Sequence, residues 1–217
     1  MHSRGDRLAA HTTVPKTEGG PLLLGLGGTT RAGSTSERVL RAALSAAEAR
    51  GARTECIAGP DLALPLYAPE NPERALAATR LIDAVRRADG IVIASPGYHG
   101  SISGMIKNAL DYVEDTARDS SPYFDGKAVG CIACAYGWQA TGSTLNALRS
   151  IVHALRGWPT PLGVAVNSSI PLFGAAGECL NADLARNLEI MADQLVQFNR
   201  KPNAARRAAL ISQEATQ

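Results

Sequence analysis

Hydroxyl groups, glycines and one arginine gather in a single short loop, residues 27–36. The loop reads Gly27-Gly-Thr-Thr-Arg-Ala-Gly-Ser-Thr-Ser36 and stands between an apolar run and a stretch with helical periodicity. The free N–H groups and the dipole at the start of a helix favour an anion. Hydroxyls donate single hydrogen bonds and a guanidinium adds a charged fork, which suits one phosphate monoester held without a metal. The residues that we expect to hold this phosphate are Thr29, Arg31, Ser34, Thr35 and Ser36.

Two other phosphate-binding motifs fit this loop less well. A dinucleotide-binding G-x-G-x-x-G that starts at Gly25 needs a glycine where Thr30 stands. A P-loop matches at Gly28 and Gly33, but Ser34 occupies the place of the lysine that reaches the β- and γ-phosphates. The remaining alternative is structural: one of the hydroxyls caps the following helix and the rest is a polar loop.

A second loop, residues 95–101, follows a β-branched run and reads Ser95-Pro-Gly-Tyr-His-Gly-Ser101. Proline is expected to end the strand, and the glycines allow the backbone to approach a flat ligand closely. Exposed N–H groups in such a turn can bond the edge of a ring, although a lone histidine in this place also fits a plain surface loop. The residues that we expect to line the ligand are Pro96, Gly97, Tyr98, His99, Gly100 and Ser101.

A third loop, residues 135–142, is aromatic and rich in glycine: Ala135-Tyr-Gly-Trp-Gln-Ala-Thr-Gly142. One interpretation is that this loop walls another side of the same flat ligand. The alternative is a simple helix entry, capped by Thr141 or Ser143, with Trp138 packing locally. Both interpretations remain open from the sequence.

The cysteines do not predict a metal or redox site. Cys131 and Cys134 have C-x-x-C spacing but lie inside a strand-like run, residues 128–135. On a strand, residues three apart point to opposite faces, so the two thiols cannot chelate one metal. No second pair completes a zinc site. We therefore expect buried core cysteines and no metal ligands. The sequence also holds no convincing catalytic triad, so we name no catalytic side chain.

These loops must be positioned by a sheet, because strand-like and helix-like stretches alternate along the chain. Five strands separated by helices predict an α/β fold, a parallel sheet covered on both faces as a three-layer sandwich. In such a sheet, ligands bind beyond the carboxyl ends of the strands. The strands are expected at 21–27, 54–58, 90–94, 127–135 and 161–166, and the helices at 35–50, 73–88, 103–114, 141–156 and 180–198.

The composition limits the possible partners and the location. The chain has 217 residues, 45% hydrophobic and 19% charged, with a formal net charge of +2. That charge is too small to indicate nucleic acid, and no apolar run is long enough for a membrane helix. The polar residues 1–20 lack the apolar core of a secretory signal, so we expect a cytoplasmic protein. We expect residues 1–20 to be a disordered extension, 21–199 to be one domain and 200–217 to be a polar tail.

Three segments together resemble a known family. They are residues 28–36, residues 88–111 (Ala88-Asp-Gly-Ile-Val-Ile-Ala-Ser-Pro-Gly-Tyr-His-Gly-Ser-Ile-Ser-Gly-Met-Ile-Lys-Asn-Ala-Leu-Asp111) and Asp61-Leu-Ala-Leu-Pro-Leu-Tyr67. On these residues the chain resembles the NAD(P)H-dependent FMN reductase family of the flavodoxin-like superfamily. The resemblance implies a five-stranded parallel sheet of order 2-1-3-4-5, FMN as cofactor and NADPH or NADH as co-substrate.

The resemblance also assigns roles to particular residues. It implies that Thr29, Arg31, Ser34 and Ser36 contact the FMN phosphate. Residues 96–101 would line the isoalloxazine, with Tyr136 and Gly137 closing another side. It further implies a homodimer or homotetramer in which Lys107 and Asp111 lie at a subunit contact.

Three functions are compatible with this resemblance. The first is an NAD(P)H:flavin oxidoreductase that supplies reduced FMN to a flavin-dependent monooxygenase. The second is a quinone, azo-dye or chromate-type reductase that holds FMN tightly. The third is a flavin electron carrier without reductase activity, which the slightly basic charge disfavours because flavodoxin-type carriers are usually strongly acidic.

Overall fold

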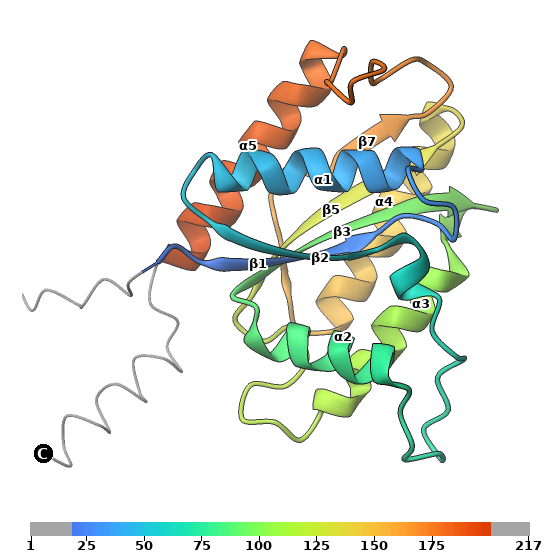
Figure 1. The fold of residues 1–217 in the computed structure, drawn as a ribbon, viewed down its shortest axis with the longest axis vertical. Helices are drawn as coiled ribbons and strands as arrows, with labels where there is room; N and C mark the ends of the chain where they lie inside the picture. The colour runs from blue at the N-terminus through green and yellow to red at the C-terminus, as the bar shows by residue number, and fades with distance from the viewer. Residues whose placement is uncertain (1–18, 201–217) are drawn as a thin grey trace, which may run out of the picture.

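The apolar runs of the sequence become the strands of one sheet in the computed structural model, which describes residues 19–200 (Figure 1). β1 (Leu22–Gly27), β3 (Gly90–Tyr98) and β5 (Ala128–Ala135) form its centre, and β2 (Arg53–Ala58) lies at one edge. The order is β2-β1-β3-β5-β6, with parallel ladders throughout. β5 is buried along its whole length because helices cover both faces of a parallel sheet.

The helices cover the two faces in separate groups. α1 (Thr35–Glu48) and α5 (Ala182–Arg200) pack on one face; α2 (Leu76–Arg87), α3 (Gly104–Asp111) and α4 (Trp138–Ala154) pack on the other. Short 3-10 helices occupy Gly59–Leu62 and Tyr112–Thr116. Successive strand residues alternate between the two cores, as the period of a strand requires.

The α/β sandwich predicted from the sequence is confirmed, with a more divided sheet. Seven strands appear in the described part of the chain, where five were expected. β4 (Ser101–Ile102) is an antiparallel addition to β3. β6 (Trp158–Pro159) and β7 (Val164–Asn167) both pair with β5 in place of the single strand expected at 161–166. Counted together as the fifth strand, they give the expected order 2-1-3-4-5.

The fifth strand is divided because the chain stops bonding β5 after Thr160, whose N–H still donates to the Val129 carbonyl at 2.9 Å. Thr160 donates its hydroxyl to the Leu162 carbonyl at 2.8 Å, and the Leu162 N–H donates to the side chain of Gln194 on α5 at 3.0 Å. Pro161, between them, has no N–H to give to a ladder. The chain therefore leaves β5 and returns to it at Val164.

Several expected boundaries were wrong for identifiable reasons. Pro96 does not end β3, because it stays in register with Cys134 of β5 and the strand continues into a hairpin. α2 begins at Leu76 rather than residue 73, since the Glu73 N–H bonds the Asn71 side chain at 3.0 Å. α4 begins at Trp138, one turn before the expected start at residue 141.

The prediction of core cysteines is confirmed. Cys131 packs in the core beneath α2, α3 and α4, whereas Cys134 packs in the core beneath α1 and α5. Burial raises the pKa of both thiols to about 12. The C-x-x-C spacing is thus an accident of strand geometry.

Two expectations concern the ends of the chain and membranes. The predicted extension, residues 1–20, and tail, residues 200–217, lie almost entirely outside the described residues. Within 19–200, none of the helices has the length and apolar character needed to cross a bilayer.

Candidate functional site

The three loops expected to carry the chemistry begin at the carboxyl ends of the three central strands of the sheet. Gly27 of β1 is in register with Ala94 of β3, and Pro96 of β3 with Cys134 of β5. The Gly28 N–H donates to the Ala94 carbonyl at 3.3 Å, which ties the first loop to the central strand. Because the strands are parallel, their carboxyl ends lie on the same side of the sheet (Figure 1). The fold thus brings the three loops side by side.

The first loop presents one cation and several hydroxyls at the start of α1. The Arg31 N–H bonds the Thr29 hydroxyl at 3.2 Å, which turns the loop sharply. The Arg31 side chain is exposed, and its guanidinium has no hydrogen-bond or ion-pair partner within residues 19–200. It is therefore available to an anion from solution.

The buried hydroxyls of this loop also act as a helix cap. Ser34 is the N-cap of α1 and accepts from the Glu37 N–H at 3.4 Å, and its oxygen lies 3.4 Å from that of Ser36. Both distances are at the long limit for hydrogen bonds. The structural alternative and the phosphate interpretation are thus compatible, because these hydroxyls retain the capacity to bond an anion. Thr35 is half-buried at the first position of the helix.

The loop holds one important residue that the sequence analysis missed. Glu37 accepts from the Gly33 N–H at 2.9 Å and from Arg41 at 2.8 and 3.0 Å, and its side chain is only 10% exposed. The signal was present in the sequence, since Ser34 and Glu37 have the S-x-x-E spacing of a capping box. Here the carboxylate reaches one residue further back than the N-cap itself.

The second loop is a β-hairpin rather than an open turn. Gly97 pairs with Ile102 and Tyr98 with Ser101, so β3 and β4 leave only His99 and Gly100 at the tip. Both tip residues have positive φ, 51° and 87°, as in the two-residue turns that suit a hairpin. Part of the backbone expected to face a ligand is therefore paired within the hairpin.

Gly97 has a packing role that the sequence analysis did not anticipate. A Cβ at this position would lie within 3.0 Å of the Thr144 hydroxyl of α4 and 3.0 Å from the Cβ of Ala135. The absence of a side chain at Gly97 therefore lets α4 approach the hairpin closely. At Gly100 a Cβ would meet nothing, so that glycine faces open space.

The third loop ends at the first turn of α4. Gly137 is the N-cap, with φ 103°, and its N–H donates to the Asn167 side chain at 3.1 Å. The cap expected from Thr141 or Ser143 was wrong, because both hydroxyls bond carbonyls of their own helix. Asn167, at the end of β7, is a second residue that the sequence analysis missed.

Aromatic side chains project from the second and third loops. Tyr98 is 53% exposed, Tyr136 83% and Trp138 64%. Trp138 therefore does not pack locally, as the structural alternative had required. Large aromatic surfaces left in water beside a polar loop are typical of a place that binds a flat ligand.

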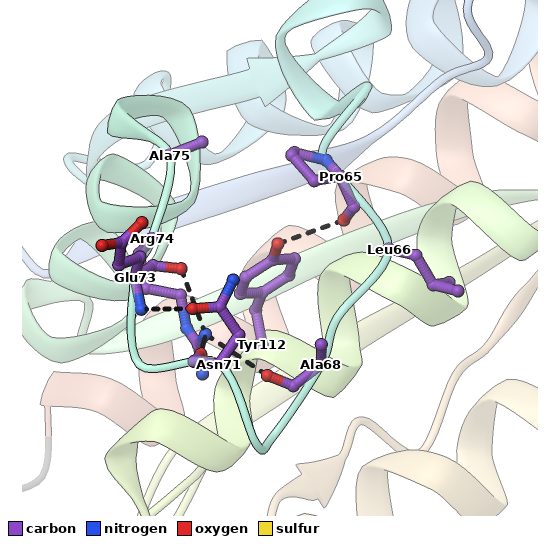
Figure 2. Close-up of a pocket in the computed structure, with 8 residues that line it drawn as sticks. All are labelled: Pro65, Leu66, Ala68, Asn71, Glu73, Arg74, Ala75 and Tyr112. Carbon is purple, nitrogen blue, oxygen red and sulfur yellow. Dashed lines mark hydrogen bonds between the residues drawn. The ribbon is translucent and has the colours of Figure 1, made fainter.

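A pocket of about 320 Å³ lies away from these loops, between residues 65–75 and Tyr112 (Figure 2). Arg74 crosses its floor, where it bonds Asp115 at 2.6 and 2.9 Å and stacks over the ring of Tyr112. The bond from Arg74 holds the pKa of the Asp115 carboxyl below its usual value. The Tyr112 hydroxyl donates to the Pro65 carbonyl at 3.1 Å. These three polar side chains are already paired within the protein, and they fix the connection before α2 against Tyr112 and Asp115.

The side chains of the first loop are of the types that bind a phosphate group. Within the described residues, no group of three or more histidine, cysteine, aspartate or glutamate side chains is placed to hold a metal ion. The donor set at the first loop, a free guanidinium with hydroxyls at a helix start, fits a phosphate group. The exposed aromatics and the hairpin fit a flat ring beside it.

A doubly wound parallel sheet with a loop rich in glycine and hydroxyl side chains after its first strand is typical of a flavodoxin-like α/β protein. The comparison with known families agrees with this class. The chain belongs to the NADPH-dependent FMN reductase family, whose sequence profile matches residues 21–170. The resemblance stated from the motifs is thereby confirmed.

Individual relatives are more distant. An NADPH azoreductase of Bacillus sp. (strain OY1-2) is 33% identical over 116 residues, which are 53% of this chain and 62% of that protein. An FMN-dependent NADPH-azoreductase of Staphylococcus aureus (strain USA300) is 32% identical over 113 residues, 51% of this chain and 56% of that one. The matches thus span about three fifths of each relative.

Among solved structures, the fold is similar to FerB, a flavoenzyme NAD(P)H:(acceptor) oxidoreductase from Paracoccus denitrificans. The TM-score is 0.65, with 20% sequence identity, over 83% of this chain and 98% of that one. At this identity the likeness supports the fold alone.

Proposed function

We propose that this protein is an NAD(P)H-dependent FMN reductase that transfers hydride from a nicotinamide to flavin. The observation that carries the proposal is the first loop, where the guanidinium of Arg31, without a partner among residues 19–200, lies close to the start of α1. Membership of the FMN reductase family and the two azoreductase relatives support the same reading.

The phosphate loop would hold the cofactor at one end. Arg31 supplies the charge, and the hydroxyl side chains and N–H groups at the helix start supply neutral donors. A single phosphate monoester presents one charged group at the loop, unlike a diphosphate. One guanidinium with a few neutral donors is therefore sufficient to bind it. The proposed phosphate ligands are Thr29, Arg31, Ser34, Thr35 and Ser36.

The other two loops would orient the ring. The hairpin, residues 96–101, is held rigid by its own ladder and by α4, so it can present a fixed edge. Tyr136 and Gly137 would close another side, with Gly137 fixed by Asn167. Bound FMN would supply the redox chemistry, accepting hydride and passing electrons on. The protein's part is to stack the rings and exclude water, and we assign no catalytic side chain.

The test uses purified protein with NADPH and NADH, with and without FMN. We expect nicotinamide oxidation only when FMN is present, and a lower rate with riboflavin, which lacks the phosphate. No flavin-dependent oxidation with either nicotinamide contradicts the proposal. Arg31→Ala should need more FMN for the same rate.

The electron acceptor divides this proposal into two cases. If FMN exchanges freely, the protein supplies reduced flavin to a partner such as a flavin-dependent monooxygenase. If FMN stays bound, the protein reduces an acceptor directly, and the azoreductase relatives favour this second case. FMN that stays with the protein through gel filtration, with azo-dye reduction in the absence of free flavin, would establish the second case.

We also propose a homodimer or homotetramer. α3 presents an exposed ion pair, Lys107 to Asp111 at 2.5 Å, at the place where the family resemblance implies a subunit contact. Leu66 and Leu76, on the connection before α2 and at its first residue, are 85% and 87% exposed and are available for burial against a second copy. Light scattering after size exclusion tests this assembly, and a monomeric mass contradicts it. The expected cytoplasmic location likewise stays a prediction, for cell fractionation to test.

A further inference from the structure

Glu37 is a nearly buried carboxylate to which the proposed function assigns no role. One oxygen accepts from the Gly33 N–H at 2.9 Å. The other accepts from Arg41 Nε at 3.0 Å and Nη2 at 2.8 Å. Both oxygens of Glu37 therefore have partners within the protein. This differs from most carboxylates in the first turn of a surface helix, which are solvated by water.

The same side chain is wedged between the ends of two strands. A Cβ on Gly28, which follows β1, would lie 3.3 Å from the Glu37 Cβ. A Cβ on Gly59, which follows β2, would lie 3.3 Å from the carboxylate. Both glycines have positive φ, 94° and 61°. The backbone at Gly28 and at Gly59 therefore packs against Glu37 from two sides. On a third side, the Glu37 carboxylate accepts the hydrogen bond from the Gly33 peptide.

We propose that Glu37 is a positioning residue for the FMN phosphate, acting by fixing the Gly33 peptide of the loop. This inference rests on the proposed function. With Gly33 held, the turn from Thr29 to Ser34 would keep one conformation. Without the acceptor, Gly33, which has φ 70° and is exposed, can turn to solvent and the loop loses that conformation.

The charge on Glu37 does not prevent this role. A carboxylate beside a phosphate would repel it, but Arg41 pairs with Glu37 through two nitrogens. The pair is close to neutral, and Arg31 remains the uncompensated charge of the loop. What the loop needs from residue 37 is therefore the hydrogen-bond acceptor, and a neutral acceptor of the same shape should serve.

The test compares two nearly isosteric variants. Glu37→Gln keeps an oxygen for the Gly33 N–H, whereas Glu37→Met fills the same volume without a strong acceptor. Glu48→Ala is the control, since Glu48 lies at the far end of the same helix. Dissociation constants for FMN and riboflavin are measured by flavin fluorescence, together with the thermal midpoint of each protein.

We expect Glu37→Met to weaken FMN about tenfold, the effect of losing roughly one hydrogen bond, and to leave riboflavin within about twofold. The dissociation constants of Glu37→Gln should stay within about threefold of the wild-type values for both flavins. Those of Glu48→Ala should equal the wild-type values. The ratio of the two flavin affinities separates positioning from a general loss of structure, which would weaken both.

Three results would overturn the inference. These are unchanged FMN affinity in Glu37→Met, equal weakening of FMN and riboflavin, and a Glu37→Gln variant as weak as Glu37→Met. Failure of the proposed function is seen separately, in the wild type, as an equal affinity for FMN and riboflavin. If Glu37→Met fails to fold, Glu37→Ala is used in its place. The smaller side chain leaves room for water to bond the exposed Gly33 N–H, so that this donor is not left without an acceptor.

Discussion

Substitution of Gly97 by alanine tests how α4 positions the hairpin of the proposed ring site. The added Cβ would lie closer to the Thr144 hydroxyl than the 3.0 Å that real Cβ atoms respect, and 3.0 Å from the Cβ of Ala135. Thr144 cannot move aside cheaply, because it is fully buried on a helix and its hydroxyl bonds the Ser101 carbonyl at 3.4 Å. We therefore expect the hairpin and α4 to separate.

The magnitude follows from the cost of overpacking a filled core, about 1–3 kcal/mol of unfolding free energy for an added methyl without room. Removing the hydroxyl should recover part of it. In Gly97→Ala with Thr144→Ala, the closest remaining neighbours are Cβ atoms at 3.0 and 3.3 Å, which can adjust by a few tenths of an ångström. A double-mutant cycle should thus give a favourable coupling of about 1 kcal/mol.

Urea unfolding of the four proteins of the cycle measures these energies. Gly104→Ala is the matched control, because a Cβ there meets nothing and residue 104 already begins α3; it should cost nothing. Flavin titration adds a functional readout, in which Gly97→Ala weakens FMN and riboflavin alike, since the hairpin is proposed to contact the ring. A wild-type midpoint for Gly97→Ala, or additive effects in the cycle, would refute the reasoning.

Three further predictions concern charge and reactivity. Arg31→Ala should weaken FMN by about 1.5–3 kcal/mol, about 10- to 150-fold, with riboflavin unaffected; an unchanged FMN dissociation constant counts against the phosphate assignment. Arg74 lowers the pKa of Asp115, so this pair stabilises the fold above the ordinary carboxyl pKa and the contribution disappears as the pH falls through the lowered one. Urea midpoints at pH 6 and pH 3 should therefore differ less in Asp115→Asn than in the wild type, and equal acid sensitivity would show that the pair contributes nothing. Burial raises the pKa of Cys131 and Cys134 to about 12, so a thiol reagent at pH 8 should not label them in the native protein, and rapid labelling would contradict their placement.

The sequence predicted the layers of this fold because hydrophobic periodicity reports burial directly. The unbroken run at 90–94 and the stripe at 35–50 became β3 and α1. The periodicity does not report which backbone groups bond outside the sheet. The division of the fifth strand depends on Gln194, more than thirty residues further along the chain. No local pattern could have shown that contact.

The candidate site shows the same limit at the level of single residues. The hydroxyls of the first loop were recognised because their number exceeds what a helix cap requires. The capping-box spacing of Ser34 and Glu37 was legible, but it does not show that the carboxylate bonds Gly33, one residue before the N-cap. The packing of Gly97 against Thr144, a residue of another element, was not legible in the sequence either. Roles that arise from contacts between elements need the folded chain.

The central claim is that this chain grips FMN by its phosphate and reduces it with a nicotinamide. The most direct measurement is anaerobic stopped-flow absorbance of the protein mixed with one equivalent of FMN and then with NADPH or NADH. We predict that the visible absorbance of the flavin bleaches with at least one nicotinamide, and far more slowly in Arg31→Ala at the same flavin concentration. Flavin absorbance that neither nicotinamide changes would contradict the account.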